Sequence, residues 1–94
     1  MFDLTSFQRD ILFVVAGMDK PKGLAIKAEL EENYGKDVNH GRLYPNLDTL
    51  VKAGLLEKGQ KDRRTNEYRL SSKGKHEIKE RSEWESSQAA EVLA

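Results

Sequence analysis

The spacing of the apolar residues changes at Gly54 of this 94-residue chain. Before Gly54, apolar side chains recur mostly every three or four residues, which is the period of an amphipathic helix. After it, residues 55–58 form a short strand-like segment and residues 66–70 alternate between apolar and polar side chains, with a polar loop between them. This is the pattern of a β-hairpin, and a helical pattern returns after Ser72. The chain is long enough for one domain.

The first part of the chain predicts three helices. The first covers about residues 6–17, and the second begins just after Pro21. The third begins between residues 39 and 42 and runs to about residue 53, because a proline such as Pro45 is tolerated only in the first turn of a helix. Three helices followed by a hairpin and a last helix, at about residues 73–92, predict a mainly α (α+β) fold. We interpret this order as a winged helix-turn-helix with a two-stranded wing.

Basic residues concentrate in one part of a chain whose formal net charge is zero. Residues 36–76 contain ten Lys or Arg and five Asp or Glu, whereas the segments on either side are net acidic. The basic part covers the third helix and the hairpin, which are the parts that a winged helix presents to a duplex. Cations there neutralise phosphates and release counterions. We therefore expect a DNA-binding domain over residues 1–72 and a C-terminal dimerisation helix over residues 73–94.

Composition and motifs argue against several other classes of protein. The chain has no cysteine, and its two histidines lie 36 residues apart with no spacing typical of a metal site, so we predict no metal. No Gly-rich phosphate loop or nucleophile motif indicates an enzyme, and we predict no cofactor. The longest apolar run, residues 11–16, is far shorter than the roughly 20 residues that span a bilayer. We expect a soluble, cytoplasmic protein.

Three segments in the same order resemble the PadR family of transcriptional regulators. Residues 41–47 read GRLYPNL and are similar to the family's GTLYPAL at the start of the recognition helix. Residues 52–57 look like its helix-to-strand junction, and residues 68–74, YRLSSKG, look like its YRLTxxG after the wing. Arg42, Leu24 and the wing sequence at 63–66 depart from the family pattern. The resemblance implies a homodimer, joined through C-terminal helices that often pack on helix 1, that acts as a repressor.

The candidate DNA-contacting residues lie on the third helix, which we expect in the major groove, and on the loop of the hairpin. Arg42 suits a guanine or a phosphate, Asn46 an adenine edge, and Thr49 a thymine methyl group. For Tyr44, a contact to a phosphate and a purely structural role are interpretations of equal weight. The wing adds three cations that we expect on the backbone or in the minor groove: Lys61, Arg63 and Arg64. The simpler interpretation of such charges is a solvated surface.

Ile78 and Trp84 are the candidates for the dimer interface, because the last helix has few apolar residues and needs a partner surface. The function predicted is a repressor that binds a pseudo-palindromic operator as a homodimer. Two alternatives stay open. One is a winged helix used as a protein-interaction module. The other is a regulator that responds to a small-molecule effector at the dimer interface, where Trp84 would line the site.

Overall fold

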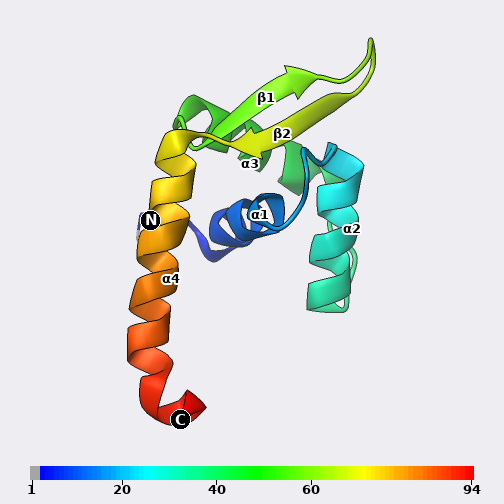
Figure 1. Ribbon diagram of the computed structural model, residues 1–94. Coiled ribbons are helices and arrows are strands. Elements are labelled where there is room, and N and C mark those ends of the chain that lie inside the picture. The colour runs from blue at the N-terminus through cyan, green and yellow to red at the C-terminus, as the bar shows by residue number, and fades with distance from the viewer. Residues whose placement is uncertain (1–2) are drawn as a thin grey trace.

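The computed structural model describes residues 3–94 and contains four helices and one two-stranded antiparallel sheet (Figure 1). The elements are α1 (Ser6–Ala16), α2 (Gly23–Tyr34), α3 (His40–Lys52), β1 (Leu56–Gln60), β2 (Asn66–Leu70) and α4 (Ser72–Leu93). The hairpin lies over α1, while α2 and α4 lie on the two sides of α1 and α3 lies behind (Figure 1). This is the winged helix-turn-helix arrangement that the sequence predicts.

The core lies where the first three helices and the base of the hairpin meet. Its fully buried side chains are aliphatic and come from every one of these elements: Ile11, Leu12, Ile26, Leu30, Leu43, Leu47, Leu50 and Leu56. Burying each such side chain contributes about 1.5–3 kcal/mol. Leu24 is 54% exposed, because it lies in the first turn of α2, outside the core.

The start of α3 at His40 confirms the predicted start between residues 39 and 42, but Pro45 lies in the second turn of the helix and not in the first. Asn39 is the N-cap, and its side-chain oxygen accepts a hydrogen bond from the Gly41 N–H at 2.6 Å. Pro45 is therefore the sixth residue of the helix and cannot donate to the carbonyl of Gly41. Both residues are exposed, so water can satisfy that carbonyl.

The hairpin is in register from Leu56 opposite Leu70 to Gln60 opposite Asn66. The second strand lies where it was predicted, and the first begins and ends slightly later than residues 55–58. The middle of the hairpin is fixed to the segment before α2, because the Tyr68 N–H donates to the Pro21 carbonyl at 2.9 Å. This bond brings the wing beside the first residues of α2.

Only the first part of α4 packs on the domain. Ser71 caps the helix by accepting the Gly74 N–H, and Gly74 passes so close to the chain that an added Cβ would lie 2.2 Å from the Leu55 carbonyl oxygen. Ile78 packs partly against the core, and most of the helix beyond it is exposed. The division of the chain at residue 72 into two functional units stays a prediction.

Within residues 3–94, no helix is both long and apolar enough to cross a membrane. The same part of the chain holds no group of three side chains suited to bind a metal ion.

Candidate nucleic-acid interface

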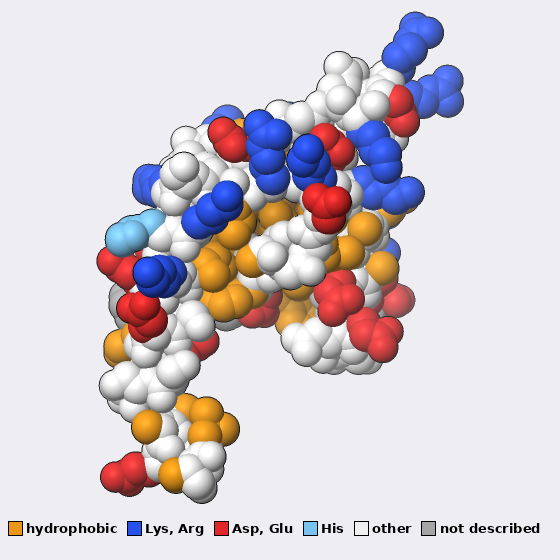
Figure 2. Space-filling model, viewed as in Figure 1, with side chains coloured by type: hydrophobic (Ala, Val, Ile, Leu, Met, Phe, Trp, Pro, Cys, Tyr) orange, Lys and Arg blue, Asp and Glu red, His pale blue; other side chains and the backbone are white. Residues whose placement is uncertain are grey.

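The wing ends in a tight, basic turn. Lys61, Arg63 and Arg64 are all exposed, and Figure 2 shows Lys and Arg side chains at the outer end of the hairpin. Asp62 lies among them, and its carboxylate accepts the Arg64 N–H at 2.9 Å. That hydrogen bond lowers the pKa of Asp62, so the carboxylate is charged and shapes the turn. The three cations predicted to contact DNA are therefore presented together at one end of the molecule.

One flank of α3 faces the start of α2 and the wing. Tyr44 is half-buried there, and its ring stacks on His40 with centroids 5.7 Å apart and planes at 13°. Its hydroxyl lies so close to Gly23 that a Cβ on that glycine would be 2.5 Å away. A glycine at the first position of α2 is what allows this approach.

A cleft of about 180 Å³ opens beside Tyr44. Its walls come from the start of α2, from α3 and from the wing: Lys22, Gly23, Leu24, Tyr44, Arg64, Thr65, Asn66 and Tyr68. Among residues 3–94, no side chain caps the N-terminus of α2 at Lys22. Free N–H groups and the helix dipole make such an end suitable for an anion. The cleft thus combines two cations, a phenolic hydroxyl and a helix N-terminus.

The other flank of α3 is closed against α1. The guanidinium of Arg42 lies 3.9 Å from the centroid of the Phe7 ring, although Arg42 is exposed. Asn46 accepts a hydrogen bond from the Gln8 side chain at 3.0 Å and donates to the Arg42 carbonyl at 2.7 Å. The structure therefore places the predicted base-contacting pair, Arg42 and Asn46, beside the first turn of α1 rather than beside the cleft.

The outward face of α3 contains the remaining predicted contact, Thr49. It is exposed, and its hydroxyl donates to the Pro45 carbonyl at 3.0 Å, so its polar group is already used within the helix. On this face the Asp48 carboxylate lies 3.9 Å from the Lys58 amine of β1. Sequence reasoning missed Asp48, Gln8 and Lys22, because their roles depend on contacts between elements that no local motif specifies.

Trp84 and Ile78 lie in different environments. Ile78 packs partly against its own core. Trp84 is 44% exposed, and the Arg81 guanidinium lies 4.7 Å from the centroid of its ring. Both assignments to a dimer interface stay predictions.

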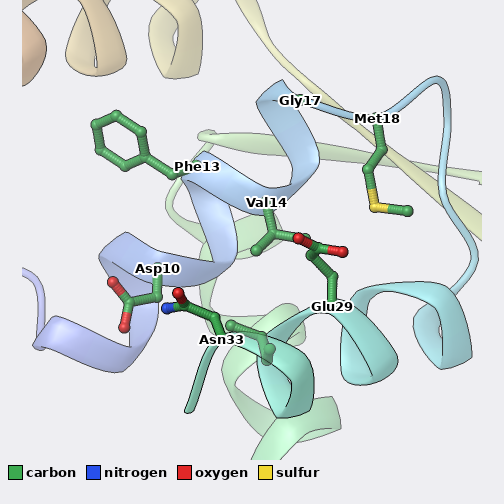
Figure 3. A pocket seen from close by; sticks show the side chains of 8 residues that line it. Asp10, Phe13, Val14, Gly17, Met18, Glu29 and Asn33 are labelled. Atoms are coloured by element: carbon green, nitrogen blue, oxygen red, sulfur yellow. The ribbon is translucent and has the colours of Figure 1, made fainter. Parts of the chain in front are cut away.

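A larger pocket lies away from the cleft, between α1 and α2 (Figure 3). It measures about 360 Å³, with apolar walls that include Phe13 and Met18 and with the carboxylates of Asp10 and Glu29 at its surface. Asp10 also accepts a hydrogen bond from the Tyr34 hydroxyl. Burial, together with Asp10, raises the pKa of Tyr34 to about 12.

Comparison with known proteins identifies relatives with this architecture. The profile of the PadR-like family of transcriptional regulators matches residues 11–80. Among solved structures, the hsRosR-S1 complex is similar at 54% identity and a TM-score of 0.89, covering 93% of this chain and 77% of the other. A solved structure of RosR from H. salinarum is 55% identical, with a TM-score of 0.88. The match covers 92% of this chain and 77% of the RosR chain. A search of curated sequences gave no match.

The family match includes all three segments in which the sequence resembles PadR proteins. It also includes α3 and the hairpin, on which the candidate interface is built. This chain belongs to the PadR-like family of transcriptional regulators, whose DNA-binding winged helix-turn-helix it contains.

Proposed function

We propose that this protein is a sequence-specific repressor that binds a pseudo-palindromic operator as a homodimer. The observation on which the proposal depends is the cleft where Lys22, Tyr44 and Arg64 meet. It joins the start of α2, the recognition helix and the wing into one cationic surface. A protein-interaction module does not require cations gathered from three elements around a helix N-terminus, so this arrangement favours DNA.

The cleft is suited to a backbone phosphate. Lys22 and Arg64 supply positive charge, the Tyr44 hydroxyl supplies a donor, and the uncapped end of α2 supplies backbone N–H groups. A phosphate held there would lie beside α3, whose width fits the major groove. Lys61 and Arg63 at the wing tip would then reach the neighbouring backbone or minor groove.

Base recognition is assigned to α3, from Arg42, Asn46 and the methyl group of Thr49. Phosphate contacts fix the register of a protein on DNA, whereas contacts to base edges supply the sequence preference. On this basis the flank of α3 beside the cleft supplies affinity, whereas the flank beside α1 and the outward face with Thr49 supply specificity.

The homodimer is proposed because α4 extends beyond its own domain. Val92 and Leu93 are 86% and 77% exposed, and hydrophobic side chains are visible on the face between α4 and α2 in Figure 2. A long helix with one unpacked half is marginal in water. A second copy would cover these side chains together with Trp84, Phe13 and Met18. Sedimentation equilibrium should give twice the 10.7 kDa chain mass, and a monomer at all concentrations would contradict the dimer.

Repression follows from occupancy, because a dimer that covers two adjacent half-sites excludes other proteins from that DNA. We place the protein in the cytoplasm with the DNA that it regulates, and the proposal includes no catalytic activity.

The salt dependence of duplex binding tests the DNA-binding surface. Arg63→Ala/Arg64→Ala should reduce the slope of log affinity against log salt by about 2, because each lost phosphate contact removes about 0.9 from the slope. The matched control is Lys75→Ala/Lys79→Ala, which removes the same charge from α4. Fluorescence anisotropy on duplexes selected from a random library gives both slopes. Equal slopes for the two double variants would refute the assignment of the wing.

A second candidate function is an effector-responsive regulator, which the pocket between α1 and α2 favours. Its apolar walls and two carboxylates suit an organic cation with an aromatic or aliphatic body. Such a ligand would bind beside the proposed dimer face. A shift in melting temperature with hydrophobic ammonium compounds, lost in Asp10→Asn/Glu29→Gln, would support it; no shift would remove the candidate.

A further inference from the structure

A continuous chain of hydrogen bonds runs from the start of α1 to the first turn of the recognition helix. The Thr5 N–H donates to Gln8 Oε1 at 3.1 Å. Gln8 Nε2 donates to Asn46 Oδ1 at 3.0 Å, and Asn46 Nδ2 donates to the Arg42 carbonyl at 2.7 Å. We call these three bonds the amide relay.

The two ends of the amide relay fix the orientation of both side-chain amides. A backbone N–H only donates and a backbone carbonyl only accepts, whereas each amide side chain has one accepting oxygen and one donating nitrogen. Gln8 must therefore turn its oxygen to Thr5 and its nitrogen to Asn46. Asn46 must in turn direct its oxygen to Gln8 and its nitrogen to Arg42, and reversing either amide breaks two bonds.

The relay leaves Asn46 with the groups that an adenine requires. The side-chain oxygen has two lone pairs and the nitrogen two hydrogens, and the relay uses one of each. One acceptor and one donor remain, in a fixed order. An asparagine reads adenine with this pair, by accepting from N6 and donating to N7.

Neighbouring contacts hold the same flank of α3 in place. Phe7 precedes Gln8 on α1 and is 4% exposed, and its ring lies under the Arg42 guanidinium. Thr5 and Gln8 also form the capping box that starts α1. The relay is thus attached to a rigid helix end and not to a mobile loop.

We propose that Gln8 is a positioning residue for operator specificity: it fixes the amide of Asn46 so that Asn46 reads an adenine. This inference rests on the proposed function, in which α3 enters the major groove. Gln8 itself contacts no base in this arrangement. Its effect on DNA binding passes through Asn46.

The test uses full-length protein and duplexes selected from a random library. Comparing the motifs selected by the unmodified protein and by Asn46→Ala identifies the base pair that Asn46 reads. The readout is then the ratio of affinities for the selected duplex and for one with 7-deazaadenine at that position, which lacks the N7 acceptor. Gln8→Met preserves size and helix propensity but removes the relay, and Gln88→Met on the exposed part of α4 is the control.

We expect Gln8→Met to lower this ratio about tenfold, as for loss of one well-oriented base contact, while affinity for unselected DNA changes less than about twofold. In the Asn46→Ala background, Gln8→Met should have no further effect on the ratio. Gln88→Met should leave it unchanged. A merely structural role of Gln8 would change the melting temperature and leave the ratio intact.

The inference would be overturned if Gln8→Met left the affinity ratio unchanged, or if it lowered the ratio equally in the Asn46→Ala background. Both results presuppose that the unmodified protein binds the selected duplex. Selection of a motif with no adenine sensitive to Asn46→Ala would also overturn it. Failure of the unmodified protein to bind any duplex would instead refute the proposed function, and the inference with it.

Discussion

The two flanks of α3 are built differently. The flank toward α1 is closed, because Arg42 lies on the Phe7 ring and Asn46 is hydrogen-bonded on both sides. The flank toward the wing is open, with a cleft lined by cations beside Tyr44. Sequence recognition requires side chains held in one geometry, whereas phosphate binding requires accessible positive charge. The difference indicates how one helix of 13 residues can serve both purposes.

Filling the open flank should have the largest effect. Gly23→Ala places a methyl group where the Tyr44 hydroxyl lies, so Tyr44 must move and the cleft must change shape. We expect a loss of about 1–3 kcal/mol of stability in urea unfolding, together with weaker duplex binding. Gly17→Ala is the matched control, because its added Cβ would make only ordinary contacts at 3.8 Å. Equal stability of the two variants would show that the open flank tolerates closure.

Loosening the closed flank should have a smaller effect. Arg42→Met keeps an apolar stem over Phe7 but removes the guanidinium from the ring. The expected loss is about 0.5–1 kcal/mol, the usual value for a cation–π contact at an exposed site. Arg63→Met at the wing tip is the control and should change the free energy of unfolding by less. If both variants unfold at the same urea concentration, the Phe7–Arg42 contact does not hold this flank.

The smallest effect concerns Tyr34 of α2. Its hydroxyl donates a hydrogen bond to the Asp10 carboxylate of α1 and so supports the closed flank. Burial and the Asp10 carboxylate raise the pKa of Tyr34 to about 12, above its ordinary value of about 10. Its neutral form is favoured in the fold, so its contribution to stability is complete below pH 10 and is lost as the pH rises through 12. Urea unfolding should therefore show a shallower decline over this range in Tyr34→Phe. An identical decline would contradict the role of this hydroxyl.

Local signals in the sequence predicted most of the fold. α2 ends at Gly35, whose φ of 70° is in the left-handed region that favours glycine. Ser71 precedes α4 and is a residue type that commonly caps the N-terminus of a helix. Such signals act within a few residues and can be read without tertiary contacts. The bounds of α3 were predicted correctly although Pro45 lies in its second turn, because an exposed carbonyl four residues earlier removes much of the penalty for a proline inside a helix.

The candidate site was only partly predictable. The basic wing is visible in the sequence because Lys61, Arg63 and Arg64 are adjacent to a turn. The rotation of α3 about its own axis cannot be seen in the sequence, because it is set by the packing of the buried leucines against other elements. That rotation decides that Asn46 faces α1. The capping spacing of Thr5 and Gln8 is readable, but the second hydrogen bond of Gln8, to a residue 38 positions away, is not.

The bond from the Tyr68 N–H to the Pro21 carbonyl has a consequence for how the wing adapts to DNA. It fastens the middle of β2 to the helix-turn-helix, so we expect the hairpin to bend mainly beyond this point, toward the turn at residues 61–65. If the wing contacts the DNA as proposed, we expect this turn to adjust to operators with grooves of different width. On the same basis we expect the offset between α3 and the middle of the hairpin to be the same on every operator.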